Sequence, residues 1–209
     1  SSSAGATGAD SNCSDAIAAT SSLYALVEDS SGETFLGQWE FFTRDDPTEG
    51  YVNYVGLEEA LDKNLTSYDS ERKTWTFKAD SWSVLDPSAR GRDSVRIEGK
   101  RNYTYGLFII ELDHIPSGCA TWPAWWMYAD PWPYLGEVDI IEQANSAGQN
   151  HFVGHTALGC SQAAVPRDSF QGGWVPALPW LHIPAAECSS GPGCSTRLPQ
   201  GTFGPPFND

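Results

Sequence analysis

Basic residues are scarce in this sequence. Only 12 lysines and arginines accompany 27 aspartates and glutamates, which gives a formal net charge of −15 at pH 7. A surface of this charge repels nucleic acid and anionic membranes, so we expect neither as a partner. The charge favours neutral ligands, although acidity alone could equally serve solubility.

Long apolar runs and metal-binding motifs are also missing. The longest apolar run, near residues 119–129, is too short to cross a bilayer. No C-x-x-C pair or histidine cluster indicates a metal site, and we expect no metal and no cofactor. There is no secretory signal, and Ser1 in place of methionine suggests that processing has already occurred.

Cysteines and N-glycosylation sequons occur together, which predicts a secreted glycoprotein that is extracellular or associated with the cell wall. Because five cysteines are present, at least one has no partner within the sequence. Four of them lie in the body of the chain and allow three disulfide pairings, whereas Cys13 lies outside it. The predicted glycosylation sites are Asn12, Asn64 and Asn102, and the disulfide candidates are Cys119, Cys160, Cys188 and Cys194.

The chain is long enough for one sizeable core, and its composition favours strands over helices. It has 209 residues, 40% hydrophobic and 12% aromatic, with 14 prolines and 20 glycines. We predict a poorly ordered Ser/Ala/Gly-rich leader over 1–21 and one all-β domain over 22–209. Short strand-like segments separated by turn residues predict a sandwich of antiparallel sheets. They cover 23–28, 34–42, 74–78, 81–85, 94–98 and 105–112, and 56–65 is the one predicted helix.

The sequence GEVDIIE at 136–142 concentrates acidic residues in an otherwise apolar run. Its β-branched residues predict a strand of about six residues. In a flat strand Glu137 and Asp139 share one face, whereas Glu142 points the other way. One β-bulge between Asp139 and Glu142 would return Glu142 to the shared face. Val138 and part of the Ile140–Ile141 pair would then face the core.

Three carboxylates on one surface repel one another, so we expect one of them to keep its proton at neutral pH. Glycoside hydrolysis requires a carboxylic acid, which donates a proton to the leaving oxygen, beside a carboxylate, which attacks the sugar carbon. A retaining mechanism needs the two carboxyl groups about 5 to 5.5 Å apart. The backbones of Glu137 and Glu142 would be roughly 13 Å apart in such a strand, so their side chains would have to lean inward on a concave sheet.

The E-x-D-x-x-E pattern of Glu137, Asp139 and Glu142 matches the bulged signature of glycoside hydrolase family sixteen, and the chain most resembles the fungal laminarinase-like members. The resemblance runs from about Ser22 to the last residue. Further landmarks in order along the chain support it: GYVNYV at 50–55, GRDSVR at 91–96, YGLF at 105–108, TWPAWW at 121–126 and HT at 155–156.

This resemblance implies a β-jelly-roll sandwich of two antiparallel sheets with a concave substrate cleft. It also implies a retaining endo-β-glucanase that cleaves β-1,3- or mixed β-1,3/1,4-glucan, polymeric or oligomeric, without a cofactor. Glu137 would be the nucleophile, Glu142 the acid/base, and Asp139 the residue that orients the nucleophile. Two alternatives stay open: a glucan transglycosylase, and a non-catalytic glucan-binding or structural extracellular glycoprotein. Three intact acids argue against the second.

Sugar contacts are implied by the same resemblance, and most of them have simpler alternatives. Asn53 could be a turn residue, and any single tryptophan could be part of the core. The resemblance favours Arg92 as a sugar contact, whereas Arg96, four residues on, could equally be part of a surface ion pair. Trp122 and Trp125 are expected to pack beneath or beside the cleft tryptophans. His155 is expected near Glu142, with a solvent-facing imidazole as the alternative. The residues expected to contact substrate are Asn53, Arg92, Trp126, Trp132 and His155.

The region after the acidic run is rich in Pro, Gly and Cys. We predict that 161–206 is a disulfide-stapled loop over one end of the cleft. In the family, a stretch like PFND at 206–209 is followed by further strands that complete both sheets. The resemblance therefore implies that the sequence is part of a longer polypeptide whose further segment completes the sandwich.

Overall fold

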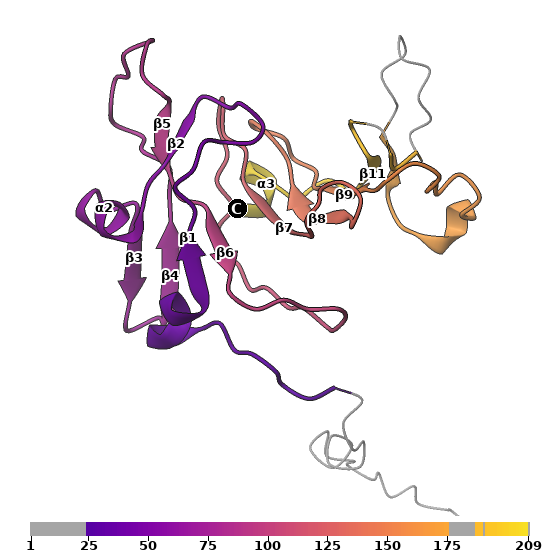
Figure 1. Ribbon diagram of the computed structural model, residues 1–209, viewed down its shortest axis with the longest axis horizontal. Coiled ribbons are helices and arrows are strands. Elements are labelled where there is room, and N and C mark those ends of the chain that lie inside the picture. The colour runs from indigo at the N-terminus through magenta and orange to yellow at the C-terminus, as the bar shows by residue number, and fades with distance from the viewer. Residues whose placement is uncertain (1–23, 176–186, 190, 209) are drawn as a thin grey trace, which may run out of the picture. The chain divides into compact units, whose positions relative to one another are not determined.

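The computed structural model describes residues 24–175, 187–189 and 191–208 (Figure 1). The predicted leader, with Asn12 and Cys13, lies outside these residues. The chain divides into two compact units, Ser1–Ile109 and Ile110–Asp209. Each unit is described by itself, and the single domain over 22–209 stays a prediction.

The first unit consists of short strand pairs and two short helices. β1 pairs with β6 and β3 with β4, both antiparallel, whereas β2 pairs with β5 in parallel. This parallel pair corrects the expectation that every pair would be antiparallel. The elements are η1 (Gly32–Gln38), β1 (Trp39–Phe41), β2 (Val52–Tyr54), α2 (Leu57–Asp62), β3 (Thr66–Asp69), β4 (Thr74–Phe77), β5 (Arg92–Ser94) and β6 (Ile97–Gly99).

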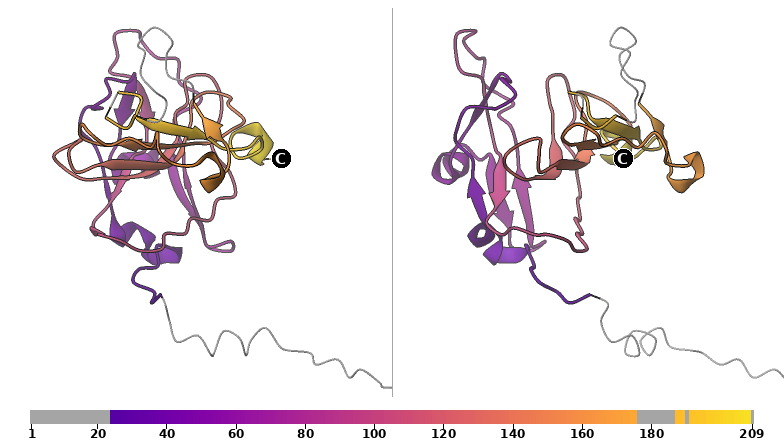
Figure 2. Two further views of the ribbon diagram at one scale, coloured as in Figure 1. Left: turned by 90° about the vertical axis from the view of Figure 1, so that its right-hand side faces the viewer. Right: turned by 45° about the vertical axis from the view of Figure 1, so that its right-hand side comes forward.

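Two apolar groupings hold the first unit together. Val55, Ala60 and Leu65 form a buried cluster beneath α2 and β3, with exposures of 2% or less. Phe35 of η1 stacks on Trp39 of β1 at 5.6 Å between ring centroids, and it also contacts two rings of β4. These contacts place η1 across the ends of β1 and β4 (Figures 1 and 2).

The second unit is built on one antiparallel sheet of five strands in the order β10-β11-β9-β8-β7. Its central strand, β9, pairs on one side with β8, which carries the acidic run, and on the other side with β11, near the C-terminal end of the described chain. The elements are β7 (Ala124–Tyr128), β8 (Glu137–Glu142), β9 (His151–His155), η2 (Arg167–Ser169), β10 (Gly173–Trp174), β11 (Cys194–Arg197) and α3 (Pro205–Asn208).

Several predicted strands are wrong. The described part of 23–28, together with 81–85 and 105–112, contains no strand, and most of 34–42 is the 3-10 helix η1. In the segment 105–112, Tyr105, Leu107 and Ile109 are 90%, 60% and 81% exposed. Apolar residues of this kind form a strand only where a neighbouring strand pairs with them, and no strand in the described part of the chain pairs with this segment.

The helix prediction for 56–65 is confirmed in the shorter α2, and the strands at 74–78 and 136–142 are confirmed as β4 and β8. The predicted loop 161–206 instead contains β10 and β11, which extend the five-stranded sheet. Val138 was expected to face the core, but it is 39% exposed. In the described ranges, no helix is both long and apolar enough to span a membrane.

Candidate active site

A β-bulge in β8 is the feature that assembles the acidic residues. Across the β8–β9 ladder Asp139 pairs with Val153 and Glu142 with His151, so three steps in β8 match two in β9. The ladder with β7 has the same mismatch, with Asp139 opposite Trp126 and Glu142 opposite Ala124. One extra residue is therefore accommodated between Asp139 and Glu142, as the sequence predicted.

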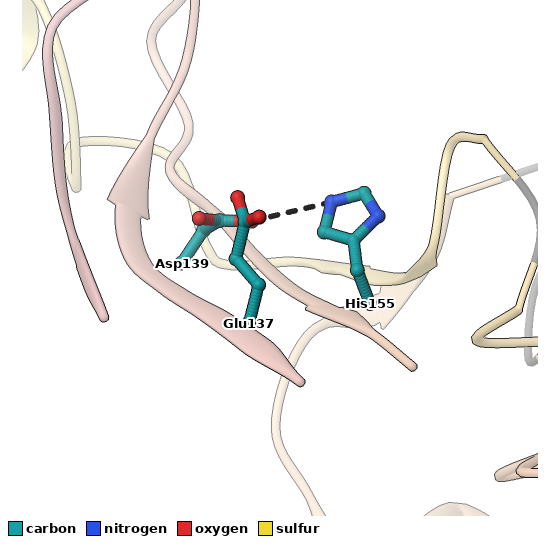
Figure 3. Close-up of side chains that lie close together, drawn as sticks. All are labelled: Glu137, Asp139 and His155. Carbon is teal, nitrogen blue, oxygen red and sulfur yellow. Dashed lines mark ion pairs between the residues drawn. The ribbon is translucent and has the colours of Figure 1, made fainter. Parts of the chain in front are cut away.

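The consequence is that all three acids share one face of the sheet. Glu137, Asp139 and Glu142 lie opposite alternate residues of β9, and alternate residues of a strand point to the same side. Figure 3 shows the carboxyl groups of Glu137 and Asp139 side by side, with the His155 imidazole facing them from β9.

Asp139 is the most deeply placed member of the acidic row, at 2% exposure. Its Oδ2 lies 3.4 Å from Nε2 of His155. This contact is the main reason that the pKa of His155 is raised above its ordinary value, and the other acids of the row act in the same direction against the effect of burial.

Glu137 is half-buried, and its carboxylate accepts a hydrogen bond from the indole Nε1 of Trp132. Burial raises the pKa of Glu137, and the neighbouring Asp139 carboxylate raises it further. The hydrogen bond from Trp132 acts in the opposite direction because it favours the charged form.

Glu142 is half-buried and has a strongly raised pKa. Burial, followed by the charge of Asp139, raises the pKa of Glu142 to about 7, although a hydrogen bond from Trp122 opposes the shift. This bond joins the indole Nε1 to Oε1 of Glu142 at 2.9 Å. A carboxyl group with this pKa keeps its proton up to neutrality, as the sequence led us to expect of one acid in the row.

The pairing of β8 with β9 places one histidine opposite each glutamate. His155, expected on the catalytic face near Glu142, lies on that face opposite Glu137 and lowers the pKa of Glu142 by its charge, and His151 lies opposite Glu142. The reason is that an antiparallel partner runs backwards, so the later histidine meets the earlier glutamate. Burial lowers the pKa of His151, and so does the charge of Arg197.

The aromatic residues surround the row only partly as expected. Trp132 is 50% exposed and contacts Glu137, and Trp126 shares the face of Asp139 and stacks on Tyr128 with centroids 4.9 Å apart. Trp122 was expected to pack beneath or beside these rings, but it is 59% exposed and holds Glu142.

A shallow pocket of about 220 Å³ lies beside Glu142. Its lining combines an indole face with hydrogen-bonding side chains, as sugar sites commonly do. His151 and Gln143 belong to this lining, and sequence reasoning gave neither a role. The pocket is lined by Trp122, Glu142, Gln143, Ala144 and His151.

Glu137, Asp139 and His155 also meet a geometric condition for sharing a cation. One donor atom from each of them lies within 4.8 Å of the other two. The sequence predicted no metal site because it has no C-x-x-C pair or histidine cluster. Two of the donors are acids of the row, and the third belongs to His155, which contacts Asp139.

Asn53 and Arg92 belong to the first unit, where other side chains already engage them. The amide nitrogen of Asn53 donates to Asp93 at 2.6 Å, and its oxygen accepts from Arg90 at 2.8 Å. Arg92 lies 3.2 Å from the buried Asp80 carboxylate. Their predicted contacts with sugar stay predictions.

Two of the candidate cysteines form a disulfide. Cys188 is bonded to Cys194, with their Cα atoms 4.2 Å apart, and Cys119 and Cys160 are exposed free thiols. Asn64 and Asn102 are both exposed, as glycosylation sites must be, and their glycosylation stays a prediction.

Comparison with known proteins identifies the family. A family model described as "XgeA-like, catalytic GH16 domain" matches residues 39–209. The chain belongs to glycoside hydrolase family 16. This confirms the resemblance found in the sequence.

Relatives of this family 16 chain are fungal proteins. It is 37% identical over 192 residues to a probable endo-1,3(4)-beta-glucanase of Aspergillus clavatus, covering 90% of this chain and 28% of that protein. It is also 37% identical over 193 residues to an endo-1,3(4)-beta-glucanase of Arthroderma benhamiae, covering 90% of this chain and 40% of that protein. The chain thus spans well under half the length of these relatives.

Two solved family 16 structures resemble the chain closely in fold. One is an elongating GH family 16 beta-1,3-glucosyltransferase, with a TM-score of 0.74 and 34% identity. The other is laminarinase 16A from Phanerochaete chrysosporium with β-glucans in both donor and acceptor sites, with a TM-score of 0.72 and 35% identity. In each case 85% of this chain and 57% of the other are covered.

Proposed function

We propose that this family 16 chain belongs to a retaining endo-β-glucanase that cleaves β-1,3- or mixed β-1,3/1,4-glucan. Glu137 is the nucleophile and Glu142 the acid/base. The observation that carries the proposal is the bulge in β8, which puts both glutamates on one face of the sheet with Asp139 between them. The pKa of about 7 at Glu142 supports its role as the proton donor.

In the first step Glu142 gives its proton to the glycosidic oxygen as the bond from that oxygen to the anomeric carbon breaks. A carboxylate oxygen of Glu137 attacks the anomeric carbon, and a covalent glycosyl-enzyme forms. In the second step Glu142, now ionised, takes a proton from water, and the water oxygen displaces Glu137. Two displacements at the same carbon retain its configuration.

Asp139 orients the nucleophile and adjusts the protonation of the pair. Its carboxylate is buried beside Glu137, and its Oδ2 contacts Nε2 of His155. A negative charge between two glutamates disfavours a second charge, so it helps to keep one of them protonated before substrate binds.

The remaining features of the proposal concern substrate and setting. Trp126, Trp132 and His155 contact sugar rings near the acids, and Asn53 and Arg92 contact sugar from the first unit. The family resemblance implies that the polypeptide folds as a β-jelly-roll sandwich with a concave cleft, to which a further segment contributes strands. The protein is secreted and N-glycosylated.

Transglycosylation is the second candidate, and the similarity to a beta-1,3-glucosyltransferase favours it. The covalent intermediate is the same, and a sugar hydroxyl takes the place of water in the second step. The non-catalytic alternative has less support, because three acids brought together at an electrostatic cost serve no evident structural purpose.

The test is incubation of the full-length polypeptide with laminarin and lichenan. Proton NMR during the first minutes distinguishes retention from inversion, because the first-formed anomer is β for retention. Chromatography of the products separates hydrolysis, which gives only shorter chains, from transfer, which also gives longer ones. An α-anomer as first product, or no change in either glucan, would overturn the proposal.

A further inference from the structure

Trp122 makes a contact with Glu142 that its position in the sequence does not reveal. The residue lies just before β7, whose first residue, Ala124, pairs with Glu142. This pairing brings the indole over the carboxyl group, and Nε1 lies 2.9 Å from Oε1. The ring is 59% exposed, so the contact is made at the open surface of the site and not in the core.

The chemistry of an indole makes this contact directional. The Nε1–H group is a donor and cannot accept a hydrogen bond, so the oxygen that it contacts must offer a lone pair. In a protonated carboxyl group one oxygen carries the proton and the other is the better acceptor. The indole therefore favours the form of Glu142 in which Oε1 is the acceptor.

We infer that Trp122 is the positioning residue of the acid/base: its indole N–H holds Oε1 of Glu142, so that Oε2 carries the proton delivered to the leaving oxygen. The inference rests on the proposed function, because it gives Glu142 the role of acid. The proton leaves Oε2 with the departing sugar in the first step, and the attacking water returns a proton to Oε2 in the second.

The pKa of Glu142 depends on the charged and titratable groups around it as well as on the indole N–H. Glu137 and Asp139 face Glu142 from its own strand, and His151 and His155 face it from β9. None of these groups is changed by a substitution at Trp122. The hydrogen bond stabilises the ionised carboxylate, so its loss must raise the pKa of Glu142 further above its present value.

The test variant is Trp122→Phe, which keeps an aromatic face and removes only the donor. We expect kcat/KM for laminarin to fall about tenfold, since the proton is no longer confined to one oxygen. For an aryl β-glucoside oligomer with a good leaving group, which needs little protonation, we expect a change of less than about twofold. The alkaline limb of the kcat/KM profile should move upward by about one pH unit, the size of one lost charge-assisted hydrogen bond.

The matched control is Trp125→Phe. Trp125 pairs with Ile141, so its side chain lies on the other face of the sheet from Glu142. The same chemical change there should leave the alkaline limb in place. If both variants move the limb equally, the effect comes from β7 as a whole and the inference is overturned.

A second measurement does not depend on catalysis. Carbon-13 NMR of labelled glutamate carboxyl groups, assigned by the signal missing from Glu142→Gln, gives the pKa of Glu142 directly. A higher pKa in Trp122→Phe supports the inference, and an unchanged or lower pKa overturns it. If the pKa rises in a protein that cleaves neither laminarin nor the aryl substrate, the hydrogen bond stands but both the proposed function and the positioning role fail.

Discussion

Glu142 lies directly opposite His151 in the β8–β9 ladder, on the face of the sheet that carries the other two acids. Glu137 lies opposite His155 instead. The pKa of His151 is lowered below its ordinary value, whereas that of His155 is raised above it. Two glutamates of one short strand thus have different neighbours, and different neighbours can give two carboxyl groups different pKa values.

The first prediction concerns the nucleophile. Glu137→Gln keeps the size of the side chain but cannot form the glycosyl-enzyme, so kcat on laminarin should fall by on the order of 10³-fold or more. Glucan should still bind, as measured by calorimetry. Glu111→Gln, a change at an exposed residue outside β8, is the control and should keep full activity. An active Glu137→Gln or Glu137→Ser variant would exclude Glu137 as the nucleophile.

The second prediction concerns the acid. Glu142→Gln removes the proton donor, and we expect a loss of about 10²- to 10⁴-fold on laminarin. An aryl glycoside with a good leaving group should lose far less in the glycosylation step, because its leaving group departs without protonation. Burst kinetics isolates that step. Equal losses with both substrates would exclude Glu142 from this role.

The third prediction concerns stability and pH. The folded-state pKa of Glu142, about 7, is above the ordinary value of 4.5. The corresponding contribution to folding is therefore complete below about pH 4.5 and is lost as the pH rises through 7. Glu142→Gln avoids that loss, so it should be more stable than the wild type at pH 8.5, by about 1 kcal/mol after solvent screening, and equally stable at pH 4. Urea unfolding at the two pH values measures this, and equal differences at both would contradict it.

The fourth prediction concerns Asp139. Asp139→Asn keeps the shape of the buried side chain and removes its charge, so the pKa of His155 should fall. We expect kcat to decrease by about 10²-fold with little change in KM, because the nucleophile loses its orientation. Proton NMR of the imidazole follows His155 independently of activity. An unchanged His155 titration would mean that the two residues do not interact in solution.

The fifth prediction concerns the loop between the disulfide cysteines. Gly193 has φ of +65°, and a Cβ there would lie 2.6 Å from the Gly154 oxygen and 3.0 Å from Cε1 of His155. Gly193→Ala should therefore destabilise the protein by about 2 to 3 kcal/mol. Gly191→Ala is the matched control, since no atom lies within 4 Å of the position of its Cβ. A similar loss of stability in both variants would show that any substitution in this loop is destabilising, and that the Cβ contacts at Gly193 are not the cause.

The bulge could be predicted from sequence because it follows from local arithmetic. Acids at odd and even positions of one strand cannot share a face unless a residue is inserted, and Ile140–Ile141 offers the place for it. The family resemblance rests on the same residues, and the family model confirms it. The roles of the individual acids stay predictions.

The contacts of Trp122 and the two histidines could not be predicted, because they depend on register. Which histidine of β9 faces which glutamate is decided by the register between the strands, and the connection 143–150 is too long for a two-residue hairpin turn to fix that register. The strand predicted at 105–112 failed for a related reason. Its residues have strong strand propensity, but that propensity is realised only where a partner strand is present.

The extra residue in β8 has a consequence for how this site can change over time. Substitutions at Ile140 or Ile141 leave the number of residues between Asp139 and Glu142 intact, so the acids stay on one side of the sheet. Loss of a single codon there would remove the extra residue and restore a flat ladder, in which the acids at alternate positions would still lie on one face, with Glu142 opposite His151. The three acids can therefore share one face at either of two spacings, and the bulge is what makes the longer spacing compatible with that arrangement.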